Sequence, residues 1–407
     1  MKPIKVSEDL YWVGAIDYGV RDFHGYVTKN GTTYNNYLLV DRDVTLFDAV
    51  HKDFFHVSID NIRSIVDPKE IKNFVVNHIE PDHSGAIEAF LREMPQATVF
   101  ITERGKKGLK RMFDIPEERI KVVKNGESLN TGKYTLLFIE TPMLHWPDSM
   151  VTYITELKTL ITQDAFGFHF ASTCRFDDEF VKTYSEYELE DAIYDYYANI
   201  LMPFGNLILK KVEDITKLGI EIKIIAPDHG VIWRSNPEKV LKLYTQMAEG
   251  KAECSITIIY DTMWHATERM VFPIVKGIED EGVKTKVVKL RSSPMSEAVK
   301  EFWKGRGMLV GTPTLNNSMF PSVAEFLYYL SGLKPRLRMA GAFGSYGWSG
   351  GGVKDAYEYL KKMGLETVEP GIEINYGPTE EDKKACYEFG RTFAKKVREY
   401  HRSIEGK

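Results

Sequence analysis

The last 150 or so residues alternate regularly between apolar, strand-like segments and amphipathic, helix-like segments. A run of this kind leaves few topologies open, because parallel strands need a crossover of a dozen or more residues, which is usually a helix. The expected elements are strand 255–260, helix 267–279, strand 284–290, helix 295–303, strand 307–311, helix 321–330, strand 338–343, helix 353–363, a strand near 365–370 and helix 380–400. Five such units predict a doubly wound α/β domain with a parallel sheet.

The N-terminal part has a different texture, in which short apolar strands dominate. They fall at 37–40, 74–76, 97–101, 135–139, 159–162 and 222–226, with helical patterns such as 85–94 between some of them. This pattern predicts sheets covered by helices. A chain of 407 residues is long for one domain. The polar stretch 247–254 is the best boundary, and it predicts domains at 1–250 and 254–407.

Charge, apolar runs and cysteine spacing indicate which partners and which cellular setting the chain suits. The net charge is −5 and no long basic run occurs, which argues against nucleic acid or an anionic membrane as the main partner. No apolar run is long enough for a transmembrane helix, and the N-terminus lacks the apolar core of a secretory signal. The three cysteines stand far apart and form no CxxC pair, so a reduced, cytoplasmic setting is predicted.

The most informative segment follows the apolar strand that ends near residue 76. Four ligand-type side chains occur there within six residues: His78, Glu80, Asp82 and His83. In extended chain His78 and Glu80 point to the same side, and the other two fall on the turn before a helix. They can therefore converge at the C-terminal end of a strand, where open α/β folds build their sites.

Three later residues extend this cluster. His145 follows the strand at 135–139 after a short loop, Asp164 follows the strand at 159–162, and His229 follows the strand at 222–226. Each lies just past an apolar strand, so all seven side chains could line one rim. We therefore predict a metal site rather than a set of unrelated polar residues.

The order His-x-Glu-x-Asp-His, followed by His, Asp and His, resembles the metallo-β-lactamase fold in its flavodiiron-protein version. Hydrolases of that fold usually carry a second histidine at the position of Glu80. A carboxylate there makes the ligand set harder and more anionic, which favours iron over zinc. The resemblance implies an αββα sandwich for the N-terminal domain and a flavodoxin-like sheet for the C-terminal domain.

The resemblance also implies roles for individual residues. One iron would be held by His78, Glu80 and His145, the other by Asp82, His83 and His229, and Asp164 would bridge them. In some members the histidine that matches His83 is swung away from the metal. His24 and Tyr26 match a segment that lines the substrate pocket, although a turn with buried aromatic residues is an equal alternative. His51 and His169 match no ligand and are interpreted as structural, while Asp48 and Asp228 are candidates for groups just outside the ligands.

Three strand-end turns of the C-terminal domain indicate a flavin. Their candidate residues are Thr262, Met263, Trp264, His265, Ala266 and Thr267 in the first, Pro313, Thr314, Asn316 and Asn317 in the second, and Ser345, Tyr346, Gly347 and Trp348 in the third. Hydroxyls and N–H groups at the first turn suit a phosphate. Neither a GxGxxG turn nor a P-loop is present there. The trio resembles the FMN loops of flavodoxins, with Trp348 able to stack on the ring.

The family resemblance implies an oxidoreductase with FMN and two iron ions. It would reduce dioxygen to water, or nitric oxide to nitrous oxide, as a head-to-tail homodimer or a dimer of dimers. These 407 residues include no CxxC-bearing rubredoxin module, so electrons are expected from an external donor such as rubredoxin or a reduced deazaflavin. Two alternatives stay open at this point: a metal-dependent hydrolase fused to a flavodoxin-like module, and an electron carrier whose first domain is structural.

Overall fold

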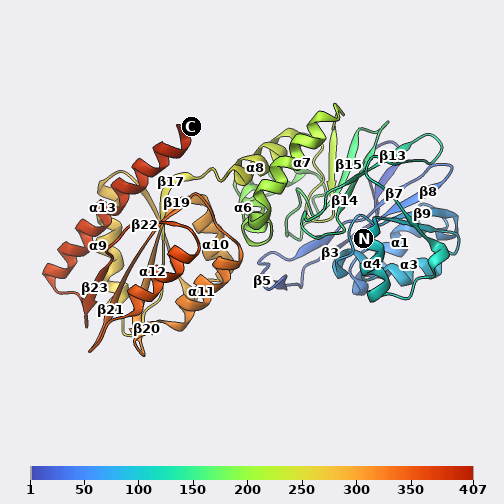
Figure 1. Ribbon diagram of the computed structural model, residues 1–407. Helices are drawn as coiled ribbons and strands as arrows, with labels where there is room; N and C mark the ends of the chain where they lie inside the picture. Colours follow the sequence, from blue (N-terminus) through green and yellow to red (C-terminus); the bar gives the residue numbers. More distant parts are fainter. Residues whose placement is uncertain (1, 407) are drawn as a thin grey trace. The chain divides into compact units, whose positions relative to one another are not determined.

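The computed structural model describes residues 2–406, which form two compact units (Figure 1). The first unit comprises the chain up to Phe23, Thr28–Tyr196 and Asn206–Thr245. The second comprises His24–Val27, Tyr197–Gly205 and the chain from Gln246 onward. Two short segments from the N-terminal half thus belong to the second unit. The domain limits of 1–250 and 254–407 stay a prediction.

Two mixed sheets form the first unit. The strands of the larger sheet, in spatial order, are β1 (Ile4–Lys5), β2 (Leu10–Trp12), β7 (Tyr37–Leu39), β8 (Val44–Phe47), β9 (Ile71–Val75), β10 (Thr98–Ile101) and β11 (Ile120–Val122). Those of the smaller sheet are β12 (Ser128–Asn130), β13 (Thr135–Glu140), β14 (Met150–Ile154), β15 (Thr159–Gln163) and β16 (Ile224–Pro227). The remaining strands of the N-terminal region are β3 (Ala15–Asp17), β4 (Asp22–Phe23), β5 (Tyr26–Val27) and β6 (Thr32–Tyr34), of which β3 pairs with β6 and β5 belongs to the second unit.

The α-helices that occur between these strands are mostly short. They are α1 (Phe55–Arg63), α2 (Pro81–Ser84), α3 (Ile87–Glu93), α4 (Glu103–Met112), α5 (Asp177–Thr183), α6 (Glu186–Tyr196), α7 (Gly205–Lys217) and α8 (Pro237–Glu249). The helix predicted over 85–94 is therefore preceded by a separate short helix, which carries two of the predicted metal residues. Among the described residues, no helix is long and apolar enough to cross a membrane.

Strand periodicity explains the layers of the first unit. Leu38, Leu46 and Phe74 face one way and pack against apolar residues of α1, α3 and α4. Their neighbours in sequence, such as Phe47 and Val75, face the other way and pack against the smaller sheet. Both faces of the central strands are therefore buried, because successive side chains alternate across a sheet. The result is a sandwich with the two sheets face to face, in agreement with the prediction.

The second unit is built on a parallel sheet with five strands side by side, and helices cover both of its faces. Its strands are β18 (Lys284–Lys289), β17 (Glu253–Tyr260), β19 (Gly305–Leu315), β21 (Met339–Tyr346) and β22 (Glu366–Thr367) in spatial order, with β20 (Ser318–Met319) on β19 and β23 (Ile372–Asn375) on β21. Its helices are α9 (Ala266–Asp280), α10 (Met295–Lys304), α11 (Pro321–Gly332), α12 (Gly352–Lys362) and α13 (Glu380–Glu405). Helices α9 and α13 cover one face, and α10, α11 and α12 cover the other (Figure 1).

The strand order of the second unit locates its functional edge. Chain order reverses at β17, which has β18 on one side and β19 on the other. The loops that leave β17 and β19 therefore diverge and open a crevice at the C-terminal edge of the sheet. The doubly wound parallel sheet agrees with the prediction. The strand expected near 365–370 is two short strands instead, and Pro370, which has no N–H to donate, lies between them.

Candidate metal centre and flavin pocket

All seven predicted metal residues lie together at one end of the sandwich. His78 and Glu80 follow β9, and Asp82 and His83 lie on α2. His145 lies in the loop between β13 and β14; Asp164 directly follows β15, and His229 follows β16. Six of the seven are buried, and Glu80 is half-buried. Strand ends far apart in sequence thus deliver four imidazoles and three carboxylates to one place.

Asp164 lies at the middle of this cluster and faces two separate pairs of histidines. Its Oδ2 is 3.0 Å from His145 Nε2 and 3.3 Å from His78 Nε2. Its Oδ1 is 2.9 Å from His83 Nε2 and 3.4 Å from His229 Nε2. One carboxylate therefore offers one oxygen to each of two ligand sets, which is the geometry that a bridging ligand between two cations requires.

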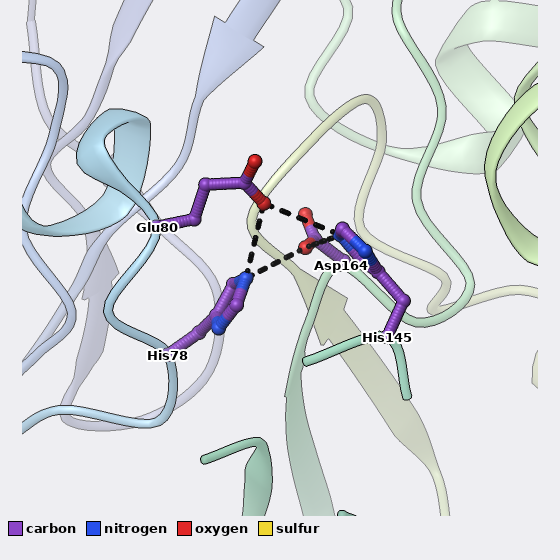
Figure 2. Close-up of side chains that lie close together, drawn as sticks. All are labelled: His78, Glu80, His145 and Asp164. Carbon is purple, nitrogen blue, oxygen red and sulfur yellow. Dashed lines mark hydrogen bonds and ion pairs between the residues drawn. The ribbon is translucent and has the colours of Figure 1, made fainter. Parts of the chain in front are cut away.

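Glu80 completes the first of these sets (Figure 2). Its Oε2 is 3.2 Å from His78 Nε2 and 3.3 Å from His145 Nε2. The four side chains in Figure 2 point toward one another, and their ligand atoms lie within 4.8 Å of one another. Two imidazole nitrogens and two carboxylate oxygens that converge in this way can surround one cation.

Asp82 completes the second set. Its Oδ2 is 3.0 Å from His229 Nε2 and 3.1 Å from His83 Nε2. Its other oxygen, Oδ1, is buried and has no hydrogen-bond partner among the described residues. A buried carboxylate oxygen without a partner is costly, and a coordinated cation would remove that cost. The orphaned oxygen and the oxygen-rich donor set both fit a second hard cation.

Groups behind the histidines fix the orientation of the rings. Asp148 Oδ2 is 3.1 Å from His78 Nδ1 and also accepts the N–H of Ile79 at 2.9 Å. Asp228 Oδ2 is 3.1 Å from His83 Nδ1. The Nδ1–H of His229 donates to the carbonyl of Thr33 at 2.6 Å. When Nδ1 is held from behind, Nε2 keeps its lone pair directed at the metal position.

The charges in the cluster shift the pKa values of its members strongly. Burial disfavours the charged form of His145, but hydrogen bonds to Asp164 and Glu80 raise its pKa to about 9. Burial is likewise outweighed at His78 and His83, whose pKa values rise well above the ordinary value because of nearby carboxylates. His83 holds the pKa of Asp164 well below its usual range despite burial. The raised pKa values of His78, His83 and His145 favour protonated imidazoles beside the carboxylates when no metal is bound.

Metal loading is therefore expected to release protons. Iron binds neutral imidazole, so at neutral pH it must displace the protons that the raised pKa values keep on these rings. We expect acidification when Fe²⁺ is added anaerobically to metal-free protein in weak buffer with an indicator dye. The release should fall as the pH rises through the His145 pKa of about 9. A His145→Ala variant should release fewer protons, and equal release from both proteins at neutral pH would contradict the expectation.

Four residues outside the predicted ligand set lie next to the cluster or support it, and one of them received no role from sequence. Asp228, a candidate for a group outside the ligands, does contact His83. Asp48, the other candidate, accepts the backbone N–H of Asn77 at 2.6 Å and so supports the loop before His78. His169, interpreted as structural, lies against His229 with ring centroids 4.6 Å apart. Asp148 received no role from sequence, although it stands only three residues after His145.

His51 lies outside the metal cluster, and the pocket candidates His24 and Tyr26 lie between β4 and β5 and at the start of β5. His51 precedes a short helical turn, where its Nδ1 accepts the N–H of Asp53 at 3.4 Å. His24 is exposed with a backbone φ of 53°, and Tyr26 begins β5 and is buried. The roles of His24 and Tyr26 at the substrate pocket stay predictions.

The three predicted flavin turns enclose one cavity of about 680 Å³ at the edge of the parallel sheet. This size is ordinary for a cofactor site. The predicted residues that line the cavity are Met263, Trp264, Ala266, Pro313, Thr314, Asn316, Asn317, Ser345, Tyr346, Gly347 and Trp348. Thr262, His265 and Thr267 belong to the first turn but do not line the cavity. Arg269, Leu315, Ser349, Tyr376 and Gly377 line it without having been predicted.

Contacts between the turns hold them together around the cavity. Thr267 and Ser345 share a hydrogen bond of 2.8 Å between their hydroxyls, so the first and third turns are tied together. Gly351 has a φ of 139°, and a Cβ at this position would lie 2.3 Å from the carbonyl oxygen of Asn317. Only glycine permits this approach of the second and third turns. Trp348 is 92% exposed beside the cavity, as a side chain available for stacking on a planar ligand would be.

Comparison with known proteins extends over both units. Residues 32–230 match the family model of ODP family beta lactamases, and residues 258–390 match that of flavodoxins. A nitric oxide reductase of Moorella thermoacetica is 42% identical, over 97% of this chain and 99% of the relative. A rubredoxin-oxygen oxidoreductase of Megalodesulfovibrio gigas is 37% identical, over 98% and 99%. The crystal structure of the flavodiiron protein from Giardia intestinalis is 31% identical, covers 99% of this chain and 98% of its own, and has a TM-score of 0.95.

Proposed function

Because the chain belongs to the flavodiiron proteins, we propose that it reduces dioxygen or nitric oxide, with FMN in the second unit and two iron ions in the first. The observation that carries this function is the pair of oxygens of Asp164, each of which faces its own pair of histidines. The function also requires a group that takes electrons from a donor. The flavin pocket in the same chain meets this requirement, because a bound flavin can accept electrons.

The geometry supports the ligand assignment that the sequence suggested. His78, Glu80 and His145 would hold one iron, Asp82, His83 and His229 the other, and Asp164 would bridge them. His83 is the residue whose ligation varies in the family. Here its Nδ1 is held by Asp228 while its Nε2 lies 2.9 Å from Asp164, and this arrangement favours the ligating orientation.

The protein and the cofactors divide the work. When bound, FMN would supply the capacity to take electrons from a donor, and the two irons would supply the capacity to reduce a diatomic gas. The chain holds the imidazole lone pairs in place through Asp148, Asp228 and the Thr33 carbonyl. Burial of six of the seven ligand-type side chains keeps bulk water away from them. We further propose that His24 and Tyr26 donate hydrogen bonds in the gas pocket.

The test combines composition with turnover on one sample. Iron and FMN are quantified in purified protein, which is then reduced anaerobically and exposed in turn to dioxygen and to nitric oxide. We expect consumption of at least one gas, without accumulation of peroxide from dioxygen, by protein that holds iron and FMN. Zinc in place of iron, with neither gas consumed, would overturn the proposal.

A metal-dependent hydrolase is not favoured. Two relatives that match nearly the whole chain are named a nitric oxide reductase and a rubredoxin-oxygen oxidoreductase. The three carboxylates of the cluster also make it more anionic than the imidazole-rich sites of zinc hydrolases. No further observation on this chain points to hydrolysis.

We propose that the protein works in the cytoplasm as a head-to-tail homodimer or a dimer of such dimers, with an external donor such as rubredoxin or a reduced deazaflavin. A relative named for rubredoxin supports the type of donor. In the arrangement proposed for this family, the FMN of one chain lies beside the irons of its partner. We therefore expect turnover per chain to fall on dilution below the dimer dissociation constant, as followed by light scattering together with a gas trace. A monomer with full turnover would contradict the dimer.

A further inference from the structure

The turn that follows β17 is anchored by a buried carboxylate. Asp261 is fully buried, and its oxygens accept the N–H of Thr262 at 2.7 Å and the Nε–H of Arg291 at 2.9 Å. The hydroxyl of Ser322, in the first turn of α11, donates to the same carboxylate. Three segments that are distant in sequence therefore meet at Asp261, directly beneath the first residue of the turn.

Arg291 contacts both Asp261 and Thr262. Its terminal nitrogen donates to the carbonyl of Thr262 while its Nε–H donates to Asp261. The guanidinium also lies 5.1 Å from the centroid of the Phe320 ring, which limits its movement. Both peptide groups that flank the Thr262 side chain, its N–H and its C=O, are consequently held by one ion pair.

In contrast to Thr262, the residues that follow it have backbone N–H groups without hydrogen-bond partners among the described residues. Within the described part of the chain, the backbone N–H groups of residues 263–267 make no hydrogen bond, since the first bond into α9 is the one from Arg269 to His265. The hydroxyl of Thr262 is buried and also lacks a partner. Free N–H groups at the start of a 15-residue helix, together with an orphaned buried hydroxyl, suit a phosphate.

We propose that Asp261 and Arg291 are positioning residues that hold Thr262 so that its hydroxyl and the following N–H groups receive the phosphate of FMN, beside the cavity that Met263 and Trp264 line. The inference rests on FMN as the flavin of this chain. Arg291 pairs with Asp261 at 2.9 Å, so its charge is already balanced, and its role is to orient the turn rather than to neutralise the phosphate. The clamp therefore controls the choice between FMN and riboflavin, which has the same ring but no phosphate.

The test measures the affinities of FMN and riboflavin for the full chain stripped of flavin, by quenching of flavin fluorescence. Arg291→Met is a suitable variant because the Arg291 side chain is 53% exposed and its removal leaves no cavity in the core. We expect FMN to bind about 10- to 100-fold more weakly, the loss typical of a hydrogen bond to a charged group. Riboflavin affinity should stay within about threefold of the wild type, a difference below 1 kcal/mol. Arg291→Lys, which cannot hold both partners, should be intermediate.

One control variant, and a comparison of the two flavins on the wild-type protein, make the outcomes distinct. Arg391→Met removes another Arg–carboxylate pair of the same unit, at 3.0 Å to Glu281, just past the C-terminal end of α9, about 22 Å along the helix from the turn. It should leave both affinities unchanged. Equal losses of FMN and riboflavin in Arg291→Met, or no loss of either, would overturn the clamp. A wild-type protein that binds FMN no better than riboflavin would instead refute the phosphate site itself, and with it the FMN assignment.

Discussion

Glu80→Ala is expected to abolish reduction of dioxygen and nitric oxide while FMN stays bound. Glu80 is the only residue of the first ligand set that supplies a carboxylate to that set alone, at 3.2 Å from His78 and 3.3 Å from His145. Its loss leaves this position with two imidazoles and one shared oxygen, too few donors to retain iron well. We expect loss of about half of the bound iron, because the set around Asp82 keeps its own donors.

The measurement is iron and FMN per chain on the same sample as a gas-consumption trace. Glu80 is half-buried rather than fully buried, so the variant should fold. Glu80→His offers a matched comparison because it restores a donor of the kind that hydrolases of this fold carry. We expect that variant to retain metal but with more zinc relative to iron, since imidazole is a softer ligand than carboxylate. Undiminished gas reduction in Glu80→Ala would refute the assignment of Glu80 as a ligand.

Asp164→Asn should have the larger effect on metal content, because among the seven described cluster residues Asp164 alone contacts histidines of both sets. Asparagine keeps the shape of the side chain but offers one acceptor oxygen, and its NH₂ group would face imidazole nitrogens. We expect iron affinity to fall by more than about 100-fold, the upper end of the effect of groups that only touch a ligand. Gas reduction should be lost, and FMN content should not change.

A second buried aspartate provides the control for folding. Asp177 is buried in the same unit, where it accepts the N–H groups of Arg234, Ser235 and Asn236 at 3.0–3.1 Å, but it takes no part in the metal cluster. Asp177→Asn should lower the midpoint of thermal unfolding while iron per folded chain stays at the wild-type value. Retention of both irons by Asp164→Asn would show that the carboxylate does not bridge them.

Much of the site could be predicted because of where its residues stand relative to the strands. Each of His78, Asp164 and His229 follows an apolar strand within a few residues, and strand ends on one side of a sandwich lie near one another. The same logic placed the three flavin turns at one edge of the parallel sheet. These predictions needed only periodicity and the type of residue at each strand end.

The supporting groups were harder to predict. Asp148 has no feature in sequence that separates it from the many aspartates on the surface, whereas Asp228 was a candidate because it stands next to His229. The carbonyl of Thr33, which holds His229, belongs to the backbone and leaves no signal at all. The clamp on the flavin turn joins Asp261, Arg291 and Ser322, which are up to 61 positions apart. Pairings of this kind depend on which segments the crossovers bring together.

Local periodicity and side-chain chemistry were enough to predict the two kinds of sheet, the strand ends that carry the candidate metal residues, and the candidates themselves. The division of the donors into two sets came from the family resemblance, whereas the contacts behind it are visible only in the tertiary structure. The packing of the two sheets turns one oxygen of Asp164 toward His78 and His145 and the other toward His83 and His229. The physical reason is that the direction of a side chain is set by the packing of segments far apart in the chain, which no local pattern records.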